Sequence, residues 1–553
     1  MGRPGTRVVL LTGLAAALPV IVSTVRAVSH GWLPLGDDAT IAVRAFDVFS
    51  LHPPVVGQYS VSSQLIGAPV RSPGPLLYWL LAIPVRMGPA APAIAMGIVN
   101  GLATIGAVAL AARRGGWLLM FACAAGLAAM CASLEASLMH DVWNPYAAIF
   151  PFTLLIFVVW SVVCGEYWLL PIAALIASFV VQAHLVYVAP VVGMLAVAGG
   201  FLVATRPRVP RRWTVGTAVV VLVCWSLPLA EEVVNRPGNL ERIVQAATAH
   251  SPRYGWANGW HAVVRTIGFP AWWLRSPRIA FDRLADVGVA PGAVATASAV
   301  AGLAGLVGLA GIGLRSRRRQ LAAPALLALA LIGAVAAVTA STPSSGALFG
   351  VIAYTLWWAS PVGLFCWLVL GYGAVVLCAR GRRFAVWRER ARARAQRGWR
   401  ASAVSVAGIA AVAAIGAVAA GRERPDRVQE IYRPARTAID RVRGAVPPGR
   451  TVLLAGSLAE DPWNVLAGLA YGLRASGRGF VASLLGIGSQ HDPQHHPHDA
   501  VVTVLEQGAS LPPGSRIVAR VRVGRVPPDG PQTRESAPRE VVVTLGPAAG
   551  GGP

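Results

Sequence analysis

The sequence contains no lysine, so all 48 of its basic residues are arginine. Charged residues make up only 13% of the chain, against roughly 25% in a typical soluble domain. This scarcity of charge excludes an ordinary soluble globular protein. The formal net charge of +24 would suit a nucleic-acid-binding protein, but many of the arginines cluster between apolar segments. We therefore expect no nucleic-acid partner.

Cysteine is also scarce, and its placement indicates neither a disulfide framework nor a metal motif. All six cysteines lie in apolar segments and none lies in the large polar parts of the chain: Cys123, Cys131, Cys164, Cys224, Cys366 and Cys378. Isolated cysteines in apolar sequence behave as small, polarizable core residues. We expect that role here.

Hydrophobic sequence is abundant, since 55% of the residues are apolar or aromatic. Stretches of about twenty apolar residues recur, each long enough to cross a hydrocarbon core of roughly 30 Å. They predict a polytopic α-helical membrane protein with about eleven spans, near residues 8–28, 91–112, 116–138, 146–164, 167–184, 187–204, 214–233, 291–314, 321–341, 350–378 and 401–420. Basic loops stay cytoplasmic, and with this count every arginine cluster lies on the side of the N-terminus. The N-terminus is therefore predicted to be cytoplasmic.

Two long loops are then predicted to be external, at residues 29–90 and 234–290. Within the first loop, residues 75–87 are apolar but would rise only about 20 Å as a helix, which is too short to span. We expect that segment to lie at the outer interface. The second loop is rich in tryptophan, which is typical of an interfacial belt and equally compatible with a substrate groove.

The chain after the last span differs in composition from the membrane domain, which we place at residues 1–420. Residues 421–526 alternate strand-like runs with one helical segment, which predicts a small external α/β domain. The strands are expected at 451–455, 480–483, 500–505 and 516–521, and the helix at 464–476. Residues 527–553 are predicted to be a disordered tail.

Asp37 and Asp38 stand out because two adjacent carboxylates follow the first span where it would leave the membrane. Such a pair has two ordinary explanations. It can mark a helix start, where acidic residues are favoured. It can also supply a general base or bind a metal ion.

Four elements of the sequence resemble the GT-C class of lipid-sugar-dependent glycosyltransferases, which includes the aminoarabinose transferases and protein O-mannosyltransferases. The run from Asp37 to Ala42 is similar to their Asp-Glu-Ala-x-Tyr-Ala motif after the first span. The run from Ser72 to Trp79 stands where they carry His-Pro-Pro-Leu or His-Pro-Gly-Pro, with Ser72 in place of the histidine. The runs 141–145 (Asp-Val-Trp-Asn-Pro) and 182–185 (Gln-Ala-His-Leu) complete a resemblance that covers roughly residues 1–210.

The resemblance implies a GT-C-like bundle and inverting transfer of a sugar from a polyprenyl-phosphate donor to a hydroxyl of a glycan, lipid or protein. Asp37 would be the general base, and Asp38 would orient it or raise its pKa by like-charge proximity. The departing phosphate needs cations at headgroup depth, preferably arginine. The candidates in the first loop are Arg44, Arg71 and Arg86, and those in the second are Arg242, Arg253, Arg265, Arg275 and Arg278.

Polar residues at the outer ends of the spans are candidates for sugar binding, with interfacial capping as the alternative. They are His140, Asp141, Asn144, Gln182 and His184. The His-rich run at 490–499 is interpreted as a flexible loop because two prolines interrupt it. The sequence predicts no cofactor or metal site and leaves dependence on a divalent ion open.

Two other functions compete with the glycosyltransferase. A transporter or lipid-linked-sugar flippase predicts ionisable residues near span centres and repeated helical layouts. Charges within the predicted spans are scarce, and a transporter has no obvious use for the long loop 29–90. A non-catalytic membrane scaffold predicts that the two acids are dispensable. Membrane lipids are expected partners in every case.

Overall fold

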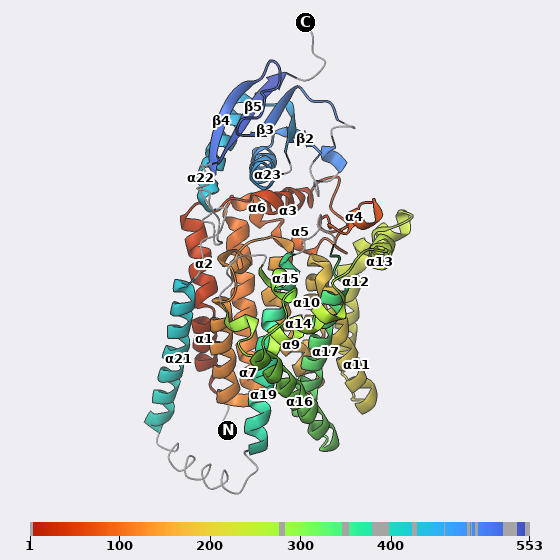
Figure 1. The fold of residues 1–553 in the computed structure, drawn as a ribbon, viewed down its shortest axis with the longest axis vertical. Helices are drawn as coiled ribbons and strands as arrows, with labels where there is room; N and C mark the ends of the chain where they lie inside the picture. The colour runs from red at the N-terminus through yellow and green to blue at the C-terminus, as the bar shows by residue number, and fades with distance from the viewer. Residues whose placement is uncertain are drawn as a thin grey trace.

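The fold, taken from a computed structural model, is mostly helical and carries one five-stranded sheet at the C-terminal end of the chain. Figure 1 shows a long helical bundle with the N-terminus near one end and the sheet domain at the opposite end. The structure describes residues 4–275, 282–344, 353–378, 398–422, 429–457, 459–483, 487, 489–492, 496–523 and 539–547.

The bundle confirms the prediction of a multi-pass helical membrane protein. Its helices are α1 Thr6–Ala16, α2 Leu18–Ser29, α7 Ala91–Cys131, α8 Asn144–Ala147, α9 Ile149–Val163, α10 Leu170–Ala183, α11 Val188–Thr205, α12 Arg211–Val234, α16 Ala293–Arg315, α17 Arg319–Ser341, α19 Ala359–Cys378 and α21 Gly398–Gly421. Among the described residues, eight helices are long and apolar enough to span a membrane, or nine if α1 and α2, bent by 49°, form one span.

The predicted number of eleven spans is not confirmed, and two features account for the difference. The element α7 covers two predicted spans and is counted as one helix, but it joins two helices across a kink at Gly116, whose φ of 64° and ψ of −150° are non-helical. The predicted span 167–184 corresponds to Tyr167–Ala183, which is a shorter apolar helix. Near the Gly116 kink, Arg113 and Arg114 both form ion pairs with Glu166, which follows α9.

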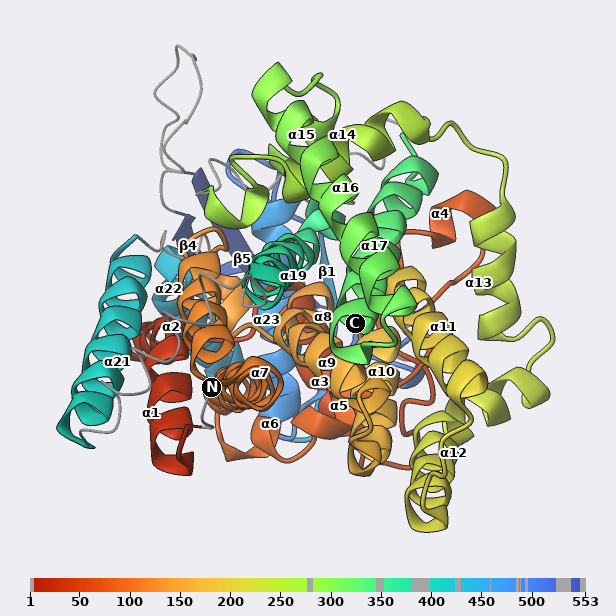
Figure 2. The ribbon, with the colours of Figure 1, turned by 90° about the horizontal axis from the view of Figure 1, so that it is seen from below.

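The centre of the bundle is packed by large apolar side chains. Seen from below, α7, α9 and α19 lie in the middle, while α12 and α21 lie at the periphery (Figure 2). The helix α9 is almost entirely buried, and its Phe157 and Trp160 both pack edge-on against Phe365 of α19. In contrast, α12 exposes most of its apolar side chains, as a lipid-facing helix does.

The first predicted external loop crosses the domain-facing end of the bundle. It forms α3 Gly36–Asp47, α4 Ser63–Ile66, α5 Leu76–Leu81 and α6 Pro84–Met87. The apolar segment 75–87 is therefore two short helices rather than a span, as its length predicted. The helix α3 lies between the bundle below and the sheet domain above (Figure 1).

The second predicted loop is more closely joined to the bundle than the sequence indicated. It contains α13 Asn239–Thr248, α14 Gly255–Ile267, the 3₁₀ turn η4 Trp272–Leu274 and α15 Asp282–Val287. The helix α14 packs along α16, α17 and α19. Its Gly259 approaches the backbone so closely that an added Cβ would lie 2.7 Å from the carbonyl oxygen of Ala336.

The C-terminal domain is an α/β unit in which α22 (Gln429–Ala445) and α23 (Glu460–Ala475) pack on a sheet. The strands are β1 Thr451–Gly456, β2 Gly479–Ala482, β3 Ala500–Glu506, β4 Arg516–Val523 and β5 Arg539–Pro547, in the order β2-β1-β3-β5-β4. The strand β1 is parallel to β2 and β3, whereas β5 is antiparallel to β3 and β4.

The prediction of a disordered tail after residue 527 is wrong for residues 539–547. These residues form β5, which pairs with β3 on one side and β4 on the other. Its Val541 and Val543 are buried in the core of the domain. The run Val-Val-Val-Thr-Leu is rich in β-branched residues, which is a strand signal that the Pro- and Gly-rich flanks obscured.

The C-terminal domain and the first loop share one hydrophobic core. Buried side chains of α3 and α5 form a single cluster with those of α22, α23 and the sheet. Phe46 of α3 contacts Tyr471 of α23 with ring centroids 6.1 Å apart. The domain is thus packed on α3 through apolar surface.

A buried carboxylate adds charge to this interface. Asp47, at the end of α3, is 1% exposed and lies 3.2 Å from Arg44, 3.2 Å from Arg474 of α23 and 3.6 Å from the imidazole of His491. A buried carboxylate needs such partners because desolvation disfavours its charge. Two of the three partners come from the C-terminal domain.

We expect Asp47→Asn to loosen the domain from α3, because the substitution leaves Arg44 and Arg474 partly buried without an anion. Removal of one member of a buried ion pair destabilises by about 3 kcal/mol or more. Thermal unfolding in detergent and release of the domain by limited proteolysis measure the effect. The matched control is Asp440→Asn, whose partner Arg443 is half exposed, with an expected change below about 0.5 kcal/mol. Equal proteolysis of the two variants would contradict the assignment.

Candidate functional site

Asp37 and Asp38 lie in the first turn of α3, at the junction of the bundle and the C-terminal domain. The helix begins at Gly36, whose φ of +52° is a left-handed conformation that favours glycine. The positive end of the helix dipole favours both carboxylates there. The helix-start interpretation is therefore correct as to position and does not exclude a chemical role.

Asp37 has the electrostatic properties of a base that works near neutral pH. Burial raises its pKa from 3.8 to about 6, while a hydrogen bond from the side chain of Trp143 acts in the opposite direction. The predicted cause, the like charge of Asp38, is not what raises the pKa. A carboxylate of this kind is ionised at neutral pH and can accept a proton from a hydroxyl within reach.

Trp143 joins two of the sequence elements that resemble the GT-C enzymes. It lies between Asp141 and Asn144 in the run before α9, and its side chain bonds to Asp37 of the first element. Trp143 also packs edge-on against Tyr146, with ring centroids 4.6 Å apart. This contact orients the indole. The sequence included this tryptophan in a motif but gave no reason to assign it a contact with Asp37.

A buried glutamine connects the helix of the two acids to α5. Gln58 donates from Nε2 to Oγ1 of Thr40 at 2.7 Å and accepts at Oε1 from the hydroxyl of Tyr78 at 3.0 Å. Burial raises the pKa of Tyr78 to about 12, so the phenol stays protonated as a donor, and the charges of Asp37, Arg44 and Arg71 all act on it. Sequence reasoning missed both Gln58 and the role of Tyr78.

The Ser72-Pro73-Gly74-Pro75 element is a tight backbone turn beside this glutamine. The N–H of Ser72 donates to the carbonyl of Gln58 at 2.8 Å, and the N–H of Gly57 donates to the carbonyl of Ser72 at 2.9 Å. A Cβ added to Gly74 would lie 2.2 Å from Oε1 of Gln182, so glycine allows the turn to pack on α10. Ser72 is buried in the turn, and its backbone hydrogen bonds define its position. Its side chain is a hydroxyl and not the imidazole of the resembling motif.

Arg71 precedes this turn and has the surroundings expected of an anion-binding group. Asn239 of α13 fixes its backbone, accepting from the N–H of Arg71 at 2.9 Å and donating to its carbonyl at 3.1 Å. The guanidinium forms no ion pair or hydrogen bond with any residue that the structure describes. Burial lowers its pKa, and the neighbouring positive charges of Arg44 and Arg242 lower it further.

The other two predicted phosphate-binding arginines are engaged within the protein. Arg44 donates to Asp47 at 3.2 Å and to Gln490 of the C-terminal domain at 3.4 Å. Arg86 donates to the carbonyls of Ala82, Ala45 and Phe46, which places it at the C-terminal end of α3. Both guanidinium groups therefore stabilise α3.

The predicted sugar-binding residues are brought to the same end of the bundle, but each makes internal bonds. Asp141 accepts from the indole of Trp32 at 2.8 Å and lies 3.4 Å from His140. Asn144 donates to the carbonyl of Ala183 at 2.9 Å, and the imidazole of His184 accepts from the N–H of Val186. Gln182 donates to the carbonyl of Cys224 at 2.7 Å. These bonds join the helix ends around the site.

The arginines of the second loop are mostly held by carbonyls and by Asp286. Arg265 and Arg275 lie 3.5 and 3.2 Å from the Asp286 carboxylate, and Arg253 donates to three backbone carbonyls. Arg278 lies outside the described residues. Within the described ranges, no group of three His, Cys, Asp or Glu residues could hold a metal ion. The predicted flexible His-rich run is ordered at its start, where Gln490 and His491 contact Arg44 and Asp47.

Comparisons with known proteins give a similar solved structure. No known protein-family model matches the chain, and no curated protein sequence matches it either. The fold is similar to the crystal structure of ArnT from Cupriavidus metallidurans bound to undecaprenyl phosphate. The similarity covers 96% of this chain and 97% of that chain, at 14% sequence identity and a TM-score of 0.49. This degree of similarity does not establish a common family.

We expect Asp37→Asn to raise the unfolding temperature of the protein at neutral pH. The folded-state pKa of about 6 lies above the ordinary 3.8, so the stability conferred by the neutral form is lost as pH rises through this window. Asparagine keeps the acceptor for Trp143 and cannot ionise. The gain should be present at pH 7.5 and absent at pH 4 in thermal unfolding of purified protein. Equal unfolding temperatures of the wild type and Asp37→Asn at pH 7.5 would show that burial does not disfavour the charge of Asp37.

Proposed function

We propose that the protein is an inverting glycosyltransferase that moves a sugar from a polyprenyl-phosphate donor to a hydroxyl acceptor at the outer face of the membrane. The observation that carries the proposal is the pairing, in one loop at the end of a membrane bundle, of a base with a raised pKa and an arginine without an internal anion. Asp37 is the base, and Arg71 is the cation. The four sequence elements that resemble GT-C enzymes support the same function.

In this reaction Asp37 takes the proton of the acceptor hydroxyl. The acceptor oxygen forms a bond to the anomeric carbon while the bond from that carbon to the phosphate oxygen breaks. The bonding electrons leave with the polyprenyl phosphate, and attack from the opposite face inverts the anomeric carbon. The leaving group is a stable anion, so the reaction requires no general acid.

Arg71 supplies charge to the donor phosphate, and Tyr78 adds a hydroxyl donor close by. A guanidinium fork matches a phosphate in charge and geometry. Because burial and the neighbouring arginines already disfavour the charge of Arg71, the donor phosphodiester would gain more from it than from a solvated arginine, and the second negative charge that forms on the phosphate as the sugar leaves would gain more still. Asp38, Asp141, Asn144, Gln182 and His184 would support the sugar pocket and the helix ends around it.

We infer the orientation from charge alone. The arginine clusters of the loops place the N-terminus in the cytoplasm, and the C-terminal domain at the opposite end of the bundle then lies outside. This orientation puts Asp37 and Arg71 at the external headgroup layer, where a lipid-linked sugar presents its phosphate. The acceptor would be a glycan, a lipid or a protein.

We expect Asp37→Asn to lower kcat/KM for sugar transfer at least a hundredfold, because it removes the proton acceptor. In the wild type, kcat/KM should fall about tenfold per pH unit below pH 6, where Asp37 is protonated. Transfer from a panel of polyprenyl-phosphate sugars in detergent is the assay, with Asp440→Asn as a surface control. Wild-type transfer by both Asp37→Asn and Asp38→Asn would show that neither acid is the base.

We expect Arg71→Ala to raise the KM for the lipid donor roughly tenfold or more, since it removes a charge-assisted contact with phosphate. The donor KM of Arg71→Lys should lie between those of the wild type and Arg71→Ala, because lysine keeps the charge and loses the two-pronged geometry of the guanidinium group. Donor titrations at low and high salt measure the effect, with the exposed Arg450→Ala as the control. A donor KM that is unchanged in Arg71→Ala would assign phosphate binding to another residue.

A further inference from the structure

Helix α23 of the C-terminal domain lies alongside α3, the helix that carries Asp37. A Cβ added to Gly36 would lie 2.4 Å from Oδ1 of Asn464 on α23. At the other end of the same pair of helices, Arg474 of α23 contacts Asp47 of α3. The two contacts are about three helical turns apart on each helix, so α3 and α23 run in the same direction, side by side. The first turns of α23 therefore lie beside Asp37.

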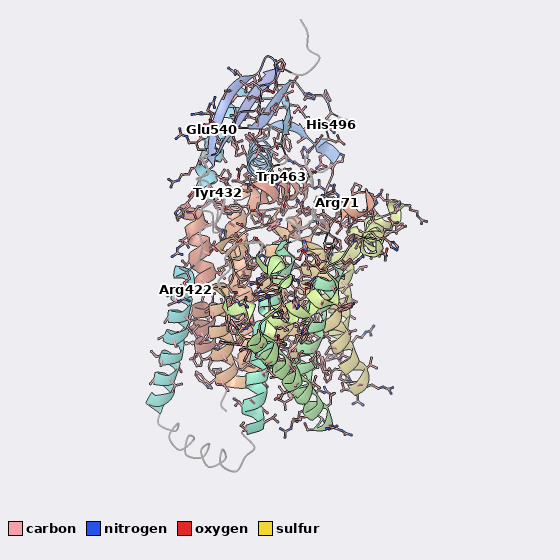
Figure 3. All side chains as sticks on the ribbon, viewed as in Figure 1. Arg71, Arg422, Tyr432, Trp463, His496 and Glu540 are labelled. Atoms are coloured by element: carbon pink, nitrogen blue, oxygen red, sulfur yellow. The ribbon has the colours of Figure 1, made fainter. Side chains whose placement is uncertain are left out.

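Two side chains in those turns have unused binding capacity. Trp463 and Asn464 are both partly exposed. Neither the indole N–H nor the side-chain amide makes a hydrogen bond to any residue in the described ranges. Figure 3 shows Trp463 at the base of the sheet domain, close to the level of Arg71.

The position of Gly36 makes this proximity possible. The indole nitrogen of Trp463 would lie 3.4 Å from a Cβ at residue 36, and the Asn464 oxygen lies nearer still. Because Gly36 lacks that atom, both polar groups reach the residue next to the base. The C-terminal domain therefore borders the candidate site.

We propose that Trp463 and Asn464 bind the acceptor, and that the acceptor is a carbohydrate. An indole offers an apolar face for the C–H face of a sugar ring together with an N–H donor at its edge. A carboxamide both donates and accepts, as adjacent sugar hydroxyls require. An acyl chain would need a continuous apolar groove, and this pair is half polar. The proposal rests on the glycosyltransferase function and adds the class of its acceptor.

The test compares two reactions of the full-length protein in detergent, each with polyprenyl-phosphate sugars as donors. One reaction is transfer to a panel of methyl glycosides, and the other is hydrolysis of the donor, in which water is the acceptor. Asn464→Ala should raise the KM for the glycoside about threefold to tenfold. Trp463→Ala should raise it about tenfold, and Trp463→Phe should restore part of the loss because it keeps a ring. Hydrolysis of the donor should be unchanged in all three variants.

The control is Thr437→Ala, an exposed residue of α22 whose hydroxyl donates to the carbonyl of Arg433 in its own helix. Binding of the methyl glycosides is measured separately by saturation-transfer NMR, which needs no turnover. Wild-type KM and wild-type glycoside binding in Asn464→Ala and Trp463→Ala would overturn this inference alone. Absence of both transfer and hydrolysis in the wild type would overturn the proposed function instead. Transfer to long-chain alcohols or serine peptides in preference to every glycoside would also overturn the carbohydrate assignment.

Discussion

The contact of α3 with α23 is the constraint on which the candidate site depends. Asp47 is buried at the end of α3, and its charge is tolerated because Arg474 and His491 of the C-terminal domain approach it together with Arg44. Arg86 of α6, in the first loop, donates to the last carbonyls of the same helix. The helix is therefore held at one end by both parts of the protein. Since a helix is stiff over three turns, its first turn, with Asp37, is positioned by the same contacts.

Most of the membrane domain could be predicted because its signals are local. The length of an apolar run decides whether it can span, and this rule correctly kept residues 75–87 out of the list of spans. The tail strand β5 was missed for the opposite reason. Its stability comes from pairing with β3 and β4, which lie far away in the sequence, and its Gly- and Pro-rich flanks indicate disorder. The docking of the domain on α3 likewise has no local signature.

The residue types of the site were also predictable, but their partners were not. Three arginines of the first loop have equal claims to a phosphate in the sequence. In the fold, Arg44 meets a carboxylate, Arg86 meets carbonyls, and Arg71 keeps its guanidinium free of both among the described residues. Trp143 stood in a recognisable motif, yet its bond to Asp37 joins segments about one hundred residues apart. Tertiary packing decides which polar side chains form hydrogen bonds within the protein.

One buried glutamine explains how Asp37 and Arg71, the proposed base and the proposed phosphate-binding residue, keep their relative positions. The side chain of Gln58 bonds to Thr40 on α3 and to Tyr78 on α5, and its backbone carbonyl accepts from Ser72, next to Arg71. These three hydrogen bonds connect α3, α5 and the segment that contains Arg71 to a single residue. Because an unmet partner in this network would be a buried polar group, its geometry resists local opening. The loop can therefore hold Asp37 and Arg71 at a fixed separation.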